Sequence, residues 1–437
     1  MSPATSIRIC VLQLPALLRR EAGLPPATLS ALSPSSLSPS SLSSGDSRAV
    51  LERKQQQMQR IKEALAAAVA AMKRGATSST FPFTAAFDHN IFSSAPVQTS
   101  YRGIVDALAT ALGELGGERS QEKQGHEEAH GNSRPFDVLV LPEMWNTPYH
   151  NSCFAAYGEP LPDLGDADEE ANEEEMRARV SPSFAFMKEM AKRLRVCVVG
   201  GSIVERREVP DESAGKDTDR KKVELYNTCC VFDREGAFIA KHRKMHLFDI
   251  SILKSDDPNG KGMIFRESAT LSAGNSLSSF SLAPFGSVGL GICYDLRFAE
   301  MALALTQQRN CKLLCYPGAF NQTTGPPHWS LLLRGRALDN QVYVVGCSPA
   351  APSPSVSGEG EYPVYGHSTV IGPYGDVIAE LGGGPGAIFA SLDRTKVDLF
   401  RKQVPTSLQK RFGEVYTQVQ EVTASDGAHR RGTGQQS

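Results

Sequence analysis

The chain has 437 residues, of which 41% are hydrophobic and 22% are charged, so it can bury the core of one large domain or of two smaller ones. Lys and Arg number 46 against 48 Asp and Glu, and the resulting net charge of -2 gives no indication of a nucleic-acid or membrane-surface partner. No apolar run approaches the roughly 20 residues that span a bilayer. The nine cysteines form no C-x-x-C pairs, which favours reduced thiols in the cytoplasm over a disulfide framework.

The beginning of the chain combines a predicted strand with a question of targeting. Residues 6–14 (SIRICVLQL) alternate well enough to form a first strand. The apolar stretch 7–18 is interrupted by Arg8, Gln13 and Pro15, which argues against a secretory signal. A Ser-rich, acid-poor opening keeps an organelle transit peptide open as the alternative to a cytoplasmic location.

Several stretches have the composition of surface insertions. Residues 23–47 are low in complexity and are predicted to be disordered, as is the tail 425–437. Residues 75–134 are largely polar, and 209–222 form a charged, loop-like insertion. Between the first two insertions, 50–73 is rich in Ala, Leu, Gln and Lys without Gly or Pro, which predicts a helix.

The middle of the chain alternates between predicted strands and predicted helices. Residues 136–141 (FDVLVL) predict a buried strand, 181–194 a helix, and 196–204 (VCVVGGSIV) a strand containing a Gly pair. The runs 225–232 and 238–241 predict a hairpin closed by a polar turn.

The second half continues this alternation. The predicted elements are strands at 288–292, 311–317 and 341–347, helices at 298–308 and 329–339, a hairpin at 366–372 and 377–381, and a helical tail opened by 391–393. Strands regularly separated by helices predict one layered α/β domain over residues 6–420, interrupted by the surface insertions.

Cys293 is the first candidate for chemistry. It follows the predicted strand 288–292 and precedes the predicted helix 298–308, and a tight turn there pushes the thiol out above the sheet. Amides at the start of a helix favour the thiolate over the thiol. The alternative is a buried structural cysteine, which is the common role of a cysteine in an apolar run.

Charged groups elsewhere in the chain could serve a thiol nucleophile. Glu143 ends a buried strand, where a carboxylate is costly unless it is used or paired, and a capping or ion-paired role is the alternative. Lys244 lies in a run of alternating cations and apolar residues, which by itself indicates a solvated surface. Glu267 taken alone would be assigned to the surface.

A metal site is the other chemistry that this region suggests. His242 and His246 are four residues apart, as metal ligands on a helix would be. Arg243 and Lys244 lie beside them and would repel a cation, so no metal site is predicted.

Longer motifs follow one another from near the start of the chain to about Tyr416. They are SIRICVLQL, LPEMWNTPY, LYNTCCVF, KHRKMHLFDI, IFRESATLSAGNS, VGLGICYDLRFAE, YPGAFNQTTGPPHW, RALDNQVYVVGCSPA and YGHSTVIGPYGDV. In this order they resemble the carbon–nitrogen hydrolases of the nitrilase superfamily, and within it most closely the ω-amidase group. The resemblance implies a Glu–Lys–Cys triad at Glu143, Lys244 and Cys293, with a supporting second glutamate at Glu267.

The resemblance also implies an architecture and a set of partners. The expected fold is an α-β-β-α sandwich, which usually dimerises, so a homodimer is expected. The stretches 23–47, 75–134 and 209–222 have no counterpart in the family, and they bear on the oligomer surface and on access to the site. The implied chemistry needs an amide substrate and water, without a metal or an organic cofactor.

The implied reaction hydrolyses the terminal amide of a short 2-oxo dicarboxylate monoamide, such as 2-oxoglutaramate or 2-oxosuccinamate, through a cysteine thioester. Arg297 could pair bidentately with the distal carboxylate, or it could form a structural ion pair with Asp295 or Glu300.

By analogy with the family, Phe320 and Thr324 line the same pocket. In the expected mechanism, Lys244 and the backbone N–H of Tyr294 could stabilise the oxyanion.

Other functions remain open on the sequence. A deaminated-glutathione amidase is the nearest alternative, and the wording of KHRKMHLFDI and GAFNQTTGP favours ω-amidase over it. A true nitrilase is a more distant one. An inactive binding module that keeps the fold is disfavoured because Glu143, Lys244, Glu267 and Cys293 are all present.

Overall fold

The computed structural model describes residues 5–14, 50, 52–53, 80–82, 136–164, 181–211, 220–255, 262–352, 362–412 and 414–415. The strands are β1 (Ser6–Gln13), β2 (Thr80–Pro82), β3 (Val138–Val140), β4 (Cys197–Val199), β5 (Ile203–Pro210), β6 (Lys221–Phe232), β7 (Phe238–Arg243), β8 (Asp249–Ile252), β9 (Met263–Arg266), β10 (Ser278–Leu282), β11 (Gly286–Leu290), β12 (Cys311–Pro317), β13 (Tyr343–Cys347), β14 (Thr369–Ile371), β15 (Val377–Glu380) and β16 (Gly386–Asp393). The helices are α4 (Asn151–Tyr157), α6 (Pro182–Leu194), α7 (Ala299–Gln308), α8 (Gly325–Asn340), α9 (Arg394–Gln403) and α10 (Thr406–Gln409).

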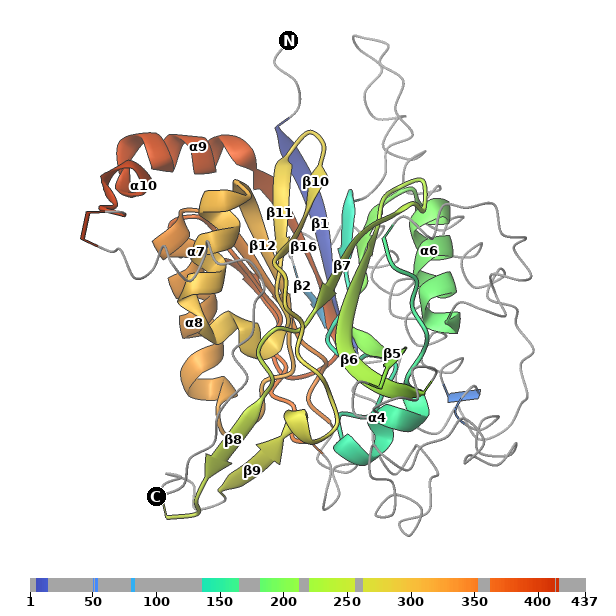
Figure 1. Ribbon diagram of the computed structural model, residues 1–437. Helices are drawn as coiled ribbons and strands as arrows, with labels where there is room; N and C mark the ends of the chain where they lie inside the picture. Colours follow the sequence, from blue (N-terminus) through green and yellow to red (C-terminus); the bar gives the residue numbers. More distant parts are fainter. Residues whose placement is uncertain are drawn as a thin grey trace.

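Two sheets pack face to face between helical layers (Figure 1). The first sheet has the order β2-β16-β1-β3-β4-β6-β5, with β7 paired to β6, and the second has the order β10-β11-β12-β13-β14-β15. Helix α6 packs on β4 and β6 of the first sheet, whereas α7 and α8 pack on the second. This arrangement confirms the predicted α-β-β-α sandwich.

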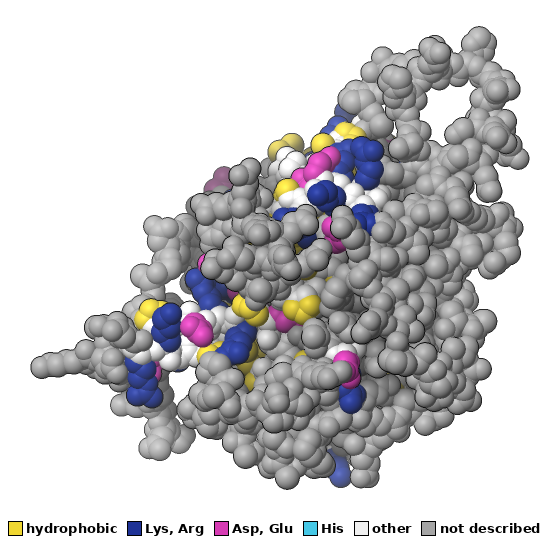
Figure 2. Space-filling view, turned by 90° about the vertical axis from the view of Figure 1, so that its right-hand side faces the viewer, with side chains coloured by type: hydrophobic (Ala, Val, Ile, Leu, Met, Phe, Trp, Pro, Cys, Tyr) yellow, Lys and Arg dark blue, Asp and Glu magenta, His cyan; other side chains and the backbone are white. Residues whose placement is uncertain are grey.

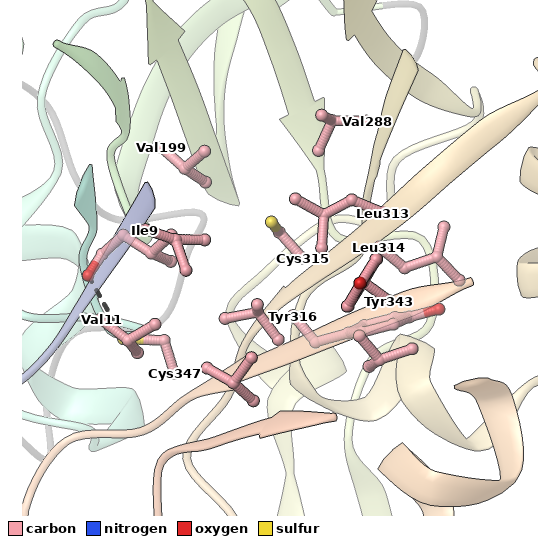
Figure 3. Packing of buried hydrophobic residues seen from close by; sticks show 14 of the residues in the cluster. Ile9, Val11, Val199, Val288, Leu313, Leu314, Cys315, Tyr316, Tyr343 and Cys347 are labelled. Atoms are coloured by element: carbon pink, nitrogen blue, oxygen red, sulfur yellow. Dashed lines mark hydrogen bonds between the residues drawn. The ribbon is translucent and has the colours of Figure 1, made fainter. Parts of the chain in front are cut away.

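The two faces of β1 explain why the first sheet needs a partner on each side. Ile9 and Val11 point into the core between the sheets, which also contains Leu313 and Cys315 of β12 (Figure 3). Cys10, between them, points the other way into the core beneath α6. Because consecutive strand residues alternate between faces, an apolar run such as β1 is stable only when both faces are covered.

Several predicted boundaries are confirmed. Helix α6 begins where expected because the Ser181 hydroxyl accepts a hydrogen bond from the Phe184 amide and caps the first turn. The hairpin of β6 and β7 and that of β14 and β15 are both antiparallel, as predicted. Helix α8 begins four residues before its predicted start at Trp329, because its prolines occupy the first helical turn, where no amide hydrogen bond is lost.

The single strand predicted at 196–204 is wrong, since it is divided into β4 and β5. Gly201 has φ +64°, and a Cβ atom there would lie 2.1 Å from the carbonyl oxygen of Pro142. Only glycine fits such a position, so the Gly pair makes a turn rather than a strand interior. The turn lies against the segment that carries Glu143.

The charged insertion predicted at 209–222 is in part wrong. Strand β5 continues to Pro210 and pairs with β6 from Lys221, and ion pairs such as Arg220–Asp211 hold this end of the hairpin. Charged residues therefore mark an exposed hairpin here rather than a loop. Residues 212–219 lie outside the described part.

The tail of the domain contains a strand that the sequence reading missed. Residues 386–393 form β16, antiparallel to β1 along its whole length, and α9 begins only after it. Residues 80–82, within the predicted polar insertion 75–134, form β2 on the other edge of β16. The rest of that insertion, the insertion 23–47, nearly all of the helix predicted at 50–73 and the tail 425–437 lie outside the described residues.

Charges on the described surface are mixed. Figure 2 shows Lys and Arg side chains lying beside Asp and Glu side chains on the face that it presents. Among the described helices, none is both long and apolar enough to cross a membrane.

Candidate active site

Cys293 opens a short 3-10 turn, Cys293–Arg297, between β11 and α7. Its φ is +48°, a left-handed conformation that is strained for any residue with a side chain. A Cβ atom on Gly318, after β12, would lie 3.2 Å from the Cα of Cys293, so a small residue is needed there. The turn lies just beyond the end of β11, and Cys293 is almost fully buried there.

Glu143 lies fully buried just beyond the end of β3. Its Oε2 accepts a hydrogen bond from the Ala319 amide at 2.7 Å, and the thiol of Cys293 donates to the same carboxylate. Its Oε1 accepts from Asn227 Nδ2 at 2.8 Å and from Lys244 Nζ at 3.3 Å. The carboxylate is therefore held between thiol and ammonium, and it caps no helix.

Lys244 follows β7 and is also fully buried. Its Nζ lies 2.7 Å from Glu267 Oε2 and 3.3 Å from Glu143 Oε1. Glu267, after β9, also accepts a hydrogen bond from the Phe248 amide at 2.7 Å. The surface assignments that the local sequence suggested for Lys244 and Glu267 are both wrong, because strands distant in sequence close over them.

Burial and neighbouring charge shift the pKa values of this group. Burial alone would lower the pKa of Lys244, but the charges of Glu143 and Glu267 outweigh it and hold the pKa well above its usual value. Burial raises the pKa of Glu143, against the lowering effect of Lys244. Burial also raises the pKa of Cys293, and the charge of Glu143 adds to this.

The expectation that helix-start amides would favour a Cys293 thiolate is therefore wrong. Burial of the turn and the charge of the nearby Glu143 carboxylate raise the pKa of the thiol instead of lowering it. The resting group is a thiol hydrogen-bonded to a carboxylate, which is the arrangement of a nucleophile with its base.

Sequence reasoning missed residues that complete this cluster. Asn227, on β6, donates to Glu143 and lies 3.4 Å from Glu267. The Tyr149 hydroxyl lies 3.4 Å from Glu143 Oε1 and 3.3 Å from Glu267 Oε1. Both residues occur in motifs quoted above, LYNTCCVF and LPEMWNTPY, but nothing in those motifs indicates which side chains converge.

Arg297 lies at the other end of the turn, close enough to Cys293 for their charges to interact. Its guanidinium lies 4.8 Å from the ring centroid of Phe320 and 5.7 Å from that of Tyr294, with Nη1 3.3 Å from Nδ1 of His328. No described carboxylate pairs with it.

The ion-pair alternative for Arg297 is therefore excluded for Asp295 and Glu300. Asp295 instead contacts His242 and His246, the pair considered above as metal ligands.

Thr324 lies just before α8, four residues after Phe320 in the sequence. The Thr324 hydroxyl donates to Asn321 Oδ1 at 3.1 Å, and its amide donates to the same oxygen at 2.8 Å. Phe320 packs on Trp329 of α8 with ring centroids 4.9 Å apart. Phe320 also lies under the Arg297 guanidinium, which is 4.8 Å from its ring centroid.

A sandwich with a buried cysteine, glutamate and lysine in contact at the ends of its strands is the architecture expected of the nitrilase superfamily. Residues 45–402, which make up most of the chain, match the carbon–nitrogen hydrolase family. The chain therefore belongs to the carbon–nitrogen hydrolase family, whose members hydrolyse carbon–nitrogen bonds.

Similar proteins include two ω-amidases. The chain is 43% identical over 297 residues to "Omega-amidase, chloroplastic" of Arabidopsis thaliana, covering 68% of this chain and 69% of that protein. It is 43% identical over 274 residues to "Omega-amidase NIT2" of Homo sapiens, covering 63% and 83%. The crystal structure of Saccharomyces cerevisiae Nit3, a member of branch 10 of the nitrilase superfamily, superposes with a TM-score of 0.55 at 27% identity, over 94% of this chain and 98% of that one.

Proposed function

We propose that this protein is an ω-amidase, which hydrolyses the terminal amide of short 2-oxo dicarboxylate monoamides such as 2-oxoglutaramate and 2-oxosuccinamate. The products are 2-oxoglutarate or oxaloacetate, plus ammonia. One observation carries the proposal: the Cys293 thiol, the Glu143 carboxylate and the Lys244 ammonium are in contact beside an arginine that has no carboxylate partner among the described residues. The two relatives named as ω-amidases support the same activity.

The first half of the reaction forms a thioester. Glu143 takes the proton of Cys293 as the sulfur attacks the amide carbonyl, which gives a tetrahedral oxyanion. Lys244 remains an ammonium, since its pKa is held high by the two carboxylates, and it faces the developing charge together with the Tyr294 amide. Glu143 then gives its proton to the departing nitrogen, and ammonia leaves.

The second half removes the acyl group. Glu143, once more a carboxylate, activates a water molecule that attacks the thioester, and the proton returns to the Cys293 sulfur as the acid product leaves. Glu267 accepts hydrogen bonds from Lys244 Nζ at 3.0 Å and from the Phe248 amide at 2.7 Å. It thereby keeps the ammonium in place through both halves.

Arg297 is the group that would select a substrate with a distal carboxylate. A carboxylate entering this corner loses water and needs a charge partner of fixed geometry, and guanidinium offers two parallel N–H donors. The faces of Phe320 and Tyr294 orient the guanidinium without neutralising it. The charge is therefore available to a ligand.

Ammonia release over a panel of amides tests the proposal. The panel contains 2-oxoglutaramate, 2-oxosuccinamate, deaminated glutathione, N-carbamoyl-β-alanine and simple nitriles. We expect the highest kcat/KM on the two 2-oxo amides. A higher value on deaminated glutathione would assign the protein to the neighbouring amidase, and no release from any compound would favour a binding module.

We also propose that residues 6–420 form one domain, because β16, at residues 386–393, pairs with β1 near the beginning of this range. A homodimer is supported by exposed apolar side chains on α8, Leu331 at 68% and Leu338 at 50% exposure. Light scattering on the purified protein tests the dimer.

The proposed location is the cytoplasm, with an organelle as the alternative. All nine cysteines are free, as a reducing compartment allows, while the Arabidopsis relative is named as chloroplastic. Imaging the tagged full chain distinguishes the two.

A further inference from the structure

Asp295, two residues after Cys293, is fully buried and lies outside the chemistry described above. Its Oδ2 accepts hydrogen bonds from the Ile292 amide at 2.9 Å and from His242 Nε2 at 3.1 Å. Its Oδ1 accepts from the His246 amide at 2.9 Å and from His246 Nδ1 at 2.7 Å. Every contact is made by a donor, so both oxygens of this carboxylate are fully used within the protein.

The contact with Ile292 acts on the strained backbone of the nucleophile. Cys293 has φ +48°, a strained conformation that persists only when the surroundings enforce it. The Asp295 side chain reaches back over Cys293 to the Ile292 amide, while the Asp295 amide donates to the Ile292 carbonyl at 3.0 Å. The backbone is therefore fastened on both sides of the sulfur.

The contacts with the histidines act on the segment that carries Lys244. His242 lies within β7 and His246 lies beyond it, so the two residues bracket Lys244 in sequence. His242 is fully buried, and the His246 ring stacks on Phe298 with centroids 3.6 Å apart. This segment comes from the first sheet, whereas the Cys293 turn belongs to the second.

We propose that Asp295 is a positioning residue, which fixes the Cys293 turn against the Lys244 segment through His242 and His246. It does not touch the reacting atoms. Its carboxylate joins a nucleophile from one sheet to an ammonium from the other, and so sets the relative position of two groups that no sequence-local contact connects. The pair of histidines that suggested a metal site in the sequence is brought together by this carboxylate instead.

A charged carboxylate suits this role at every working pH. Burial by itself raises the pKa of Asp295, but the hydrogen bonds from His242 and His246 outweigh burial and hold the pKa below its usual range. The donors that face it include the Ile292 amide as well as both imidazoles. If the Asp295 carboxylate were protonated, its O–H group would face N–H donors and one of its hydrogen bonds would be lost.

The decisive variant is Asp295→Asn, which keeps the shape and places an NH₂ group against one pair of donors. We expect kcat on 2-oxosuccinamate to fall roughly a hundredfold, the scale of a displacement of about 1 Å between reacting groups, while KM changes by less than about threefold. Alkylation of Cys293 by iodoacetamide, located by mass spectrometry, should slow in parallel. A role in stability alone would lower the melting temperature and leave both rates unchanged.

A second pair of variants decides the question even if Asp295→Asn does not fold. His246→Ala removes one donor, and His246→Asn restores an N–H near the position of Nδ1. We expect the Ala variant to lose roughly tenfold in kcat and the Asn variant to recover most of it, since one of several hydrogen bonds to a charged group is at stake. Equal losses in the two variants, or no loss in either, would overturn the proposal.

The matched control is Glu205→Gln, which alters a buried carboxylate that contacts Arg243 and Lys241 rather than the Cys293 turn. It should lower stability and leave kcat within about threefold. An Asp295→Asn protein that is folded and has the wild-type kcat and alkylation rate would also overturn the proposal.

The inference rests on the proposed role of Cys293 but not on the identity of the amide. If the wild-type protein released no ammonia from the panel, the proposed function would fail, while the alkylation rates would still report on Asp295.

Discussion

Two ionic clusters lie on opposite sides of the end of β7. One holds charged side chains in ion pairs, and the other contains the charged groups proposed for catalysis. The structural cluster consists of Lys241, Arg243, Glu205 and Asp163, and the reactive cluster of Lys244, Glu143 and Glu267. Arg243 and Lys244 are consecutive, and alternate strand residues point to opposite sides. Arg243 therefore lies in the structural cluster, whereas Lys244, the next residue, lies in the reactive cluster.

The structural cluster is balanced in charge and closely paired. Arg243 contacts Glu205 through Nη2 at 2.6 Å and Nε at 2.8 Å, and Lys241 lies 2.7 Å from the same carboxylate. Burial raises the pKa of Glu205, but the hydrogen bond from Arg243 and the charge of Lys241 outweigh it, so the net shift is downward. Such a carboxylate is a weak base.

The reactive cluster has two carboxylates for one ammonium, and no water-exposed member. The pKa of Glu143 is shifted upward, whereas that of Glu205 is shifted downward, although both groups are buried. The charge of Lys244 does not offset the effect of burial on the pKa of Glu143. A buried carboxylate with too little positive charge around it therefore has a raised pKa, as the group proposed as the base does.

The largest expected effect comes from removing the thiol that the reactive cluster serves. Cys293→Ala should abolish turnover, by roughly ten-thousandfold or more, since the remaining groups cannot form the thioester. The protein should still fold, because one sulfur is lost. Intact mass spectrometry after a rapid quench should show an acyl adduct on the wild-type protein, and an adduct on any other cysteine would contradict the assignment.

Exchanging the two adjacent cations for methionine tests the comparison directly. Lys244→Met should lower kcat/KM by roughly a hundred- to a thousandfold and destabilise the fold by about 3–5 kcal/mol, because it leaves buried carboxylates without their cation. Arg243→Met should lower stability while kcat/KM stays within a few-fold, because Glu205 keeps Lys241. Initial rates and chemical denaturation give both quantities, and equal losses of activity would remove the distinction.

Arg297 differs from the cations of both clusters because it has no carboxylate partner among the described residues. Arg297→Ala should lower kcat/KM on 2-oxosuccinamate by roughly a hundredfold or more, since losing one partner of a desolvated pair costs about 2–5 kcal/mol. Arg297→Lys should recover part of the loss. An uncharged short amide is the control substrate and should be nearly unaffected; a parallel loss on it would make Arg297 structural.

The smallest effect is a shift in pH dependence. Glu143 acts as a base only when deprotonated, so kcat/KM should fall as the pH drops through its pKa, which burial places above the ordinary value of 4.5. Glu267→Gln removes a negative charge that raises this pKa, so the midpoint of the acid limb should move to lower pH. Asp163→Asn, in the structural cluster, should leave the midpoint in place. A shift to higher pH in the Gln variant would exclude Glu143 as the titrating base.

The layered α/β class and the positions of most strands could be predicted from the sequence. Strands buried in a sheet need alternating or continuous apolar residues, and such patterns are visible in the local sequence. The sequence also placed a cysteine at a strand end and, through the order of its motifs, singled out Glu143, Lys244 and Glu267. The predictions of secondary structure were wrong where the conformation of a segment depends on contacts with a segment distant in sequence. Strand β16 forms because β1 is available to pair with it, and the Gly201 turn forms because Pro142 lies against it.

The arrangement of the candidate site came from the folded structure alone. Taken alone, the local sequence indicated a surface position for Lys244 and Glu267, whereas the folded chain buries both of them together with Cys293. The hydrogen bonds of Asn227 and Tyr149, and the carboxylate of Asp295 between two histidines, join segments distant in sequence. Sequence patterns record which residues are apolar or charged, but a pKa and a hydrogen bond depend on which atoms become neighbours when the two sheets close.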